Sequence, residues 1–129
     1  MKTERAFVYI IRCEDDSLYT GITKDVDKRF ETHFLKKKAA AKYTKSHQVK
    51  YIEAVYKASS YKSAARLEYA IKHLSREKKL SFIRDSYEKG KKTTLGKKLV
   101  AEYFPSLKDE HFVLLPEYIK TARTFHGKE

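Results

Sequence analysis

Five side chains in the first part of the chain have types that could do chemistry together. They are two phenols, a guanidinium, an imidazole and a carboxylate: Tyr9, Tyr19, Arg29, His33 and Glu68. Groups of these kinds can hold a metal ion, activate water and neutralise a phosphate when they meet in one place. The structural alternative is that Arg29 and Glu68 form a salt bridge, with His33 packing at the boundary of the core. The elements that position these residues decide between the two readings.

Two short strands carry the tyrosines. Residues 6–13 (AFVYIIRC) and 18–22 (LYTGI) are rich in β-branched and aromatic types, and the polar EDDS between them predicts a turn. The pattern therefore predicts a β-hairpin. Residues 49–57 (VKYIEAVYK) have the same composition and predict a third strand.

The length of the hairpin loop decides which face each tyrosine occupies. A two-residue loop would put Tyr9 and Tyr19 on opposite faces, but such loops prefer Asn-Gly or Asp-Gly to the Asp-Asp found here. An odd loop, with Cys13 opposite Ser17, instead places Gly21 opposite Tyr9 and both tyrosines on one face. We then expect a gap beside Tyr9 that another molecule could enter. On the hairpin alone, ordinary strand aromatics and a bulge at Gly21 remain the alternative.

Residues 23–38 predict a first helix. Thr23 can cap it, and an apolar stripe recurs at helical spacing at Val26, Phe30 and Phe34. Arg29 and His33 share one face of this helix, at the border of that stripe. A guanidinium beside an imidazole at the edge of a core is costly unless it meets an anion.

Residues 61–79 predict a second amphipathic helix, which we expect to continue through 80–89. Its apolar stripe is Ala64, Leu67, Ile71 and Leu74, and Glu68 lies at the edge of this stripe. From Gly90 onward the composition changes, and two prolines predict short helices joined by turns. We therefore expect one domain over residues 1–90 and a basic C-terminal extension over 91–129.

Charge and composition favour a polyanionic partner. The chain has 129 residues, a formal net charge of +12 and a sequence pI near 9.7, which suits nucleic acid. The longest apolar run, AFVYII, is far shorter than a membrane span. The single cysteine, Cys13, excludes a disulfide within the chain and fits a cytoplasmic location.

Four segments resemble, in order and spacing, the motifs of the GIY-YIG nuclease superfamily, and in particular its small stand-alone bacterial proteins. They are VYI (8–10), YTG (19–21), DVDKRFETH (25–33) and ARLEYAIKHLSREKK (65–79). The resemblance implies an α/β (α+β) fold with a three-stranded antiparallel sheet flanked by helices, here followed by a helical extension. It also implies an endonuclease that hydrolyses phosphodiester bonds with a divalent metal ion.

The resemblance assigns roles to the hairpin residues. Tyr9 would help to deprotonate the attacking water, Tyr19 would orient water or phosphate, and Gly21 would keep the site open. On the helices, Arg29 would stabilise charge on the phosphate and His33 would assist the proton transfer.

The resemblance also implies a metal site and a nucleic-acid partner. Glu68 would ligate one Mg²⁺ or Mn²⁺, which can keep several waters in a site with few protein ligands. We expect the partner to be DNA rather than RNA. Single-stranded or branched DNA is among the expected substrates.

The segment 36–50 is a basic connection that could hold the phosphate backbone. Its candidate contacts are Lys36, Lys37, Lys38, Lys42, Tyr43 and Lys45. A solvated, passive charge run is the alternative reading. The alternative for the whole chain is a basic nucleic-acid-binding module with little or no catalysis.

Overall fold

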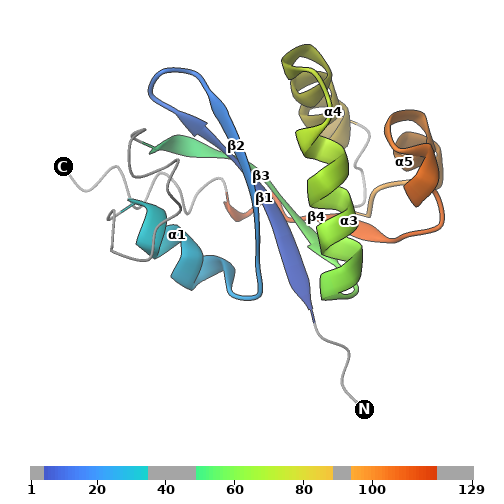
Figure 1. The fold of residues 1–129 in the computed structure, drawn as a ribbon, viewed down its shortest axis with the longest axis horizontal. Helices are drawn as coiled ribbons and strands as arrows, with labels where there is room; N and C mark the ends of the chain where they lie inside the picture. The colour runs from blue at the N-terminus through green and yellow to red at the C-terminus, as the bar shows by residue number, and fades with distance from the viewer. Residues whose placement is uncertain (1–4, 35–48, 89–93, 119–129) are drawn as a thin grey trace.

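The computed structural model describes residues 5–34, 49–88 and 94–118. It is a four-stranded antiparallel sheet flanked by helices on both faces (Figure 1). Along the chain the elements are β1 (Ala6–Cys13), β2 (Leu18–Thr23), α1 (Val26–Phe34), β3 (Val49–Ala58), α3 (Tyr61–Lys72), α4 (Arg76–Glu88), α5 (Lys97–Tyr103), a 3₁₀ turn η1 (Pro105–Leu107) and β4 (Phe112–Leu114). The strand order is β2-β1-β3-β4, so β2 forms one edge of the sheet. The predicted fold class is confirmed.

The hairpin has the register that the odd loop predicts. The backbone N–H of Cys13 donates to the carbonyl of Ser17 over 2.9 Å, and Gly21 lies opposite Tyr9. Both tyrosines therefore project from the same face of the sheet, as expected.

Alternation along β1 divides the core between the two faces. Val8 and Ile10 point toward α3 and α4, in a cluster that also contains Leu67 and Phe82. The intervening residues on the other face, Tyr9 among them, join a smaller cluster under α1. Figure 1 shows α1 on one side of the sheet and α3, α4 and α5 on the other.

The first helix begins differently from the expectation. The N–H of Lys28 donates to the carboxylate of Asp25 over 3.1 Å, so Asp25 caps α1 and the prediction that Thr23 caps it is wrong. The Thr23 hydroxyl instead accepts a hydrogen bond from the N–H of Asp25, also over 3.1 Å. Aspartate is the better cap here because its side chain reaches an N–H three residues on. Val26 and Phe30 are buried as predicted.

The predicted helix over 61–79 is two helices. Ser60 caps α3 by accepting a hydrogen bond from the N–H of Ser63. The helix ends at Lys72, and Ser75 accepts a hydrogen bond from the N–H of Lys78 over 3.1 Å at the start of α4. The apolar spacing continues past the break, so periodicity alone did not reveal the new cap.

The C-terminal extension is part of the same sheet. Its strand β4 pairs antiparallel with β3, with Val113 opposite Lys57, so the sheet has one strand more than expected. Leu99 and Phe104 of the extension are buried in the cluster on the α3 side. After β4 the chain crosses to the α1 side, where Tyr118 packs against the second cluster. None of the helices within the described residues is long and apolar enough to cross a membrane.

Candidate active site

Tyr9 lies at the centre of the candidate site, buried at 1% exposure in β1. Its ring extends across Gly21 of the edge strand. A methyl group built on Gly21 would stand 2.5 Å from Cζ of Tyr9 and would overlap its hydroxyl. The space that the glycine leaves is therefore filled by the tyrosine ring itself. The expectation that another molecule enters this gap is wrong, because the missing side chain lets Tyr9 reach the sheet edge.

Two aromatic rings hold Tyr9 in place. The Tyr19 ring lies 6.2 Å away between centroids and is tilted by 43°. Phe30 of α1 meets Tyr9 edge-on at 5.4 Å. The hairpin and the first helix together fix the direction in which the Tyr9 hydroxyl points.

The electrostatics of Tyr9 show which charged groups converge on it. Burial is the main cause that raises its pKa well above the usual value, and Tyr19 and Glu68 raise it further. The guanidinium of Arg29 acts in the opposite direction and lowers this pKa. The phenols of β1 and β2, Arg29 of α1 and Glu68 of α3 are therefore brought into one electrostatic site.

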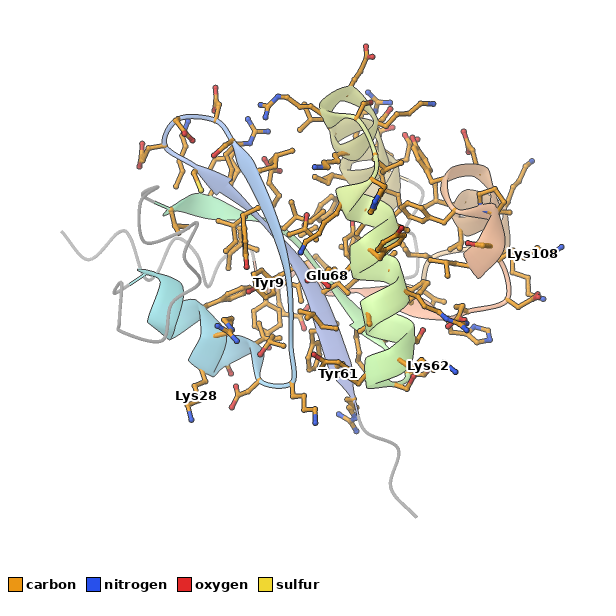
Figure 2. The ribbon with its side chains drawn as sticks, in the orientation of Figure 1. Tyr9, Lys28, Tyr61, Lys62, Glu68 and Lys108 are labelled. Atoms are coloured by element: carbon orange, nitrogen blue, oxygen red, sulfur yellow. The ribbon has the colours of Figure 1, made fainter. Side chains whose placement is uncertain are left out.

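This site lies where helices from opposite faces approach the β2 edge. Figure 2 shows Tyr9 and Glu68 close together beside the sheet, between α1 and α3. Glu68 is partly exposed, and its Oε2 lies 3.4 Å from Nζ of Lys72, one turn further along α3. Among the described residues no ion pair joins Arg29 to Glu68, so the salt-bridge alternative is not what the structure contains.

The structure describes only part of the remaining predicted site residues. His33 lies in the last turn of α1, one turn beyond Arg29, and its side chain is outside the described part. The basic contacts predicted in 36–45 also lie outside the described residues.

The donor set tests whether a metal ion fits. No group of three or more His, Cys, Asp or Glu side chains suitable for a metal occurs within the described residues. Glu68 is a single, partly exposed carboxylate beside two phenols. Such a site suits a hard cation such as Mg²⁺, which binds through one or two carboxylates and retains several waters.

Two features of the site were not predicted. Tyr118 of the extension packs edge-on against Phe30 at 5.9 Å, behind the ring that supports Tyr9. Lys24 lies 5.5 Å from the ring of Tyr61, which links the turn before α1 to the first turn of α3. Neither contact has a signal in local periodicity, because each joins segments far apart in the sequence.

Comparison with known proteins identifies the architecture. Residues 5–81 match the family described as the GIY-YIG catalytic domain. The chain is 47% identical over 77 residues to a UPF0213 protein of Fusobacterium nucleatum, covering 60% of this chain and 75% of that protein. It is 43% identical over 79 residues to a UPF0213 protein of Staphylococcus haemolyticus, covering 61% and 94%.

A solved structure is also similar. The solution NMR structure of the UPF0213 protein BH0048 from Bacillus halodurans has 39% sequence identity and a TM-score of 0.41, covering 67% of this chain and 88% of that one. The family match over residues 5–81 contains every candidate catalytic and metal residue. The C-terminal extension lies beyond this match. This chain belongs to the GIY-YIG catalytic domain family, a family of nucleases.

Proposed function

We propose that the protein is a metal-dependent endonuclease that hydrolyses phosphodiester bonds in DNA. Its proposed substrates include single-stranded and branched DNA. The observation that carries the proposal is the convergence of Tyr19, Arg29 and Glu68 on the buried Tyr9. A buried phenol that interacts with a cation from α1 and a carboxylate from α3 suits proton transfer beside a phosphate.

Each residue has a role in this proposal. In its deprotonated form, Tyr9 would accept a proton from the attacking water, and Tyr19 would orient the water or the phosphate. Arg29 neutralises charge that develops on the phosphate oxygens. His33, one helical turn from Arg29, assists the proton transfer.

Glu68 is the proposed ligand of one Mg²⁺ or Mn²⁺. A bound divalent cation would supply positive charge that stabilises the phosphate and opposes the effect by which Glu68 raises the Tyr9 pKa. Without positive charge nearby, burial keeps the Tyr9 phenol protonated at neutral pH. Arg29 contributes part of the required positive charge from the protein itself.

The second candidate is a basic nucleic-acid-binding module that turns over slowly or not at all. The raised pKa of Tyr9 favours it, because a protonated phenol is a poor base. The net charge of +12 serves either function.

The proposed cytoplasmic location is supported by the lone cysteine, Cys13, which is buried and forms no disulfide.

The test is Glu68→Gln, which keeps the shape of the side chain and removes its charge. If Glu68 holds the metal, cleavage of a labelled oligonucleotide in Mn²⁺ should fall by orders of magnitude. Binding should persist or tighten, because a negative charge near phosphate is lost. Glu77→Gln on the exposed side of α4 is the matched control and should cleave normally.

Thermal unfolding must be measured beside cleavage. Loss of the partly exposed pair with Lys72 should cost no more than about 1 kcal/mol. Near-normal cleavage by a folded Glu68→Gln protein would refute the metal assignment. No cleavage by wild-type protein in either metal, together with salt-dependent binding, would favour the binding module.

A further inference from the structure

A groove of about 710 Å³ lies between α3 and the C-terminal extension. One wall is α3, with Lys62, Arg66 and Tyr69, and the other includes Ser106 and Leu107 of the extension. At about 100° per residue, this wall lies on a different side of α3 from Glu68. Figure 2 shows Lys62 and Glu68 on different sides of the helix. The groove is therefore distinct from the candidate active site and lies beyond what the matched region alone could form.

Specific polar contacts hold the two walls together. Arg66 Nη1 lies 2.6 Å from one carboxylate oxygen of Glu110, and the Ser63 hydroxyl donates to the other oxygen over 2.6 Å. The hydrogen bond from Ser63 is the main cause that lowers the Glu110 pKa. Both Glu110 oxygens are thus engaged in joining the extension to α3, and the groove is formed before any ligand arrives.

Tyr69 gives the groove an aromatic surface. It is 66% exposed, the largest exposed fraction among the large hydrophobic side chains of the described residues. Its ring lies 4.1 Å from that of His73 between centroids, and Nδ1 of His73 is 2.8 Å from the Tyr69 carbonyl oxygen. The two rings form a supported platform that remains open to solvent.

The charges around this platform are complementary to a nucleic-acid strand. Lys62 and Arg66 line the groove, and none of the described residues that line it is acidic. Arg66 also pairs with Glu110 but keeps about half of its side chain exposed. Lys62 and Tyr69 are seven residues apart, about 10 Å along the helix. Cations beside an exposed ring are typical of surfaces that bind unpaired bases.

We propose that this groove binds an unpaired nucleic-acid strand, with a base stacked on Tyr69 and phosphates beside Lys62 and Arg66. The strand would be a flank of the substrate cut near Glu68, and in this respect the inference depends on the proposed function. Tyr61, 43% exposed at the start of α3, lies next to Lys62 in the chain. Figure 2 shows both residues at the same end of α3.

The experiment measures binding of the full chain to a fluorescent oligothymidylate in chelator, so that no cleavage occurs. Tyr69→Ala should weaken binding by roughly 5- to 150-fold, the range expected for loss of one stacked base. Tyr69→Trp should restore affinity, because a larger ring can stack. Tyr51→Ala, an exposed tyrosine on β3, is the matched control and should bind as the wild type does.

The second part of the experiment compares binding to single-stranded and to duplex nucleic acid. Tyr69→Ala should leave binding to a duplex of the same length unchanged, whereas Lys62→Ala should weaken binding to both and reduce its salt dependence. Wild-type affinity of Tyr69→Ala for the single strand would overturn the proposal, as would an equal loss for the duplex. If Tyr69→Ala binds the single strand more weakly and the wild-type protein cleaves no substrate, the groove is supported and the proposed nuclease activity is not. If Tyr69→Ala binds and cleaves as the wild type does, the groove is refuted and the proposed nuclease activity is supported.

Discussion

Replacing Gly21 with alanine places a methyl group where the Tyr9 ring lies, and the structure sets the size of the effect. The new Cβ would stand 2.5 Å from Cζ of Tyr9, so the ring must move by about 1 Å to reach a normal carbon separation of about 3.5 Å. Tyr19 and Phe30 bound the ring on either side. Overpacking of this kind costs about 1 to 3 kcal/mol of unfolding free energy.

The displacement should reduce activity more than stability. A shift of about 1 Å in a catalytic group lowers the rate by roughly 100-fold. The melting temperature should fall by roughly 4 to 12 °C. Thermal unfolding by circular dichroism and oligonucleotide cleavage in Mn²⁺ measure the two effects. Gly96→Ala is the matched control, because a Cβ there meets no atom within 4 Å. As a change at the N-cap of α5 it should cost no more than about 1 kcal/mol and leave cleavage unchanged.

A double variant separates the steric cause from other causes. The Tyr9 hydroxyl is the atom nearest to the new methyl group. In a Tyr9→Leu background, which lacks both the hydroxyl and Cζ, Gly21→Ala should therefore cost less stability than in the wild type, while cleavage stays low. If Gly21→Ala alone keeps the wild-type melting temperature and cleavage rate, Tyr9 does not depend on this glycine and the positional argument is refuted.

Three further predictions concern the base, the extension and the basic segment. Because burial raises the pKa of Tyr9, its deprotonated fraction grows with pH, so the logarithm of the cleavage rate should rise with slope about 1 from about pH 6 to 9. A plateau near neutrality, or the same profile in Tyr9→Phe, would contradict its role as base. A chain ending at Glu88 should lose its cooperative thermal transition by near-UV circular dichroism, since it lacks the buried apolar side chains of the extension; a sharp transition would show that these are dispensable. Changing Lys36, Lys37 and Lys38 to alanine should flatten the plot of log affinity against log salt, and an unchanged slope would make this segment a passive surface.

The hairpin and its site could be predicted because local rules decide them. The parity of the loop between Cys13 and Ser17 determines that Tyr9 and Gly21 face each other, and the structure has this register. Helical spacing likewise located the buried residues of α1 and α3 and left Glu68 at the border of the core. These features depend on neighbours a few residues apart or on a single pair of strands.

The remaining features depend on contacts that local patterns do not encode. Strand β4 has only three residues, too few to show an alternation. Its partner is more than fifty residues earlier in the chain. The position of the Tyr9 ring over Gly21 also escaped prediction, because register gives the direction of a side chain and not the angle at which its ring lies. Competition between Thr23 and Asp25 for the helix cap was decided by turn geometry at the end of β2.

The short strand β4 also affects how the protein behaves in concentrated solution. Without it, β3, ten residues long and mostly apolar on its buried positions, would be the outer strand of the sheet. A long open strand offers its unpaired N–H and C=O groups to other chains and promotes aggregation. Strand β4 covers part of that edge and ends after three residues, while Thr94 bridges to Val113 on its outer side. The C-terminal segment thus leaves a shorter open edge, which limits strand addition between molecules.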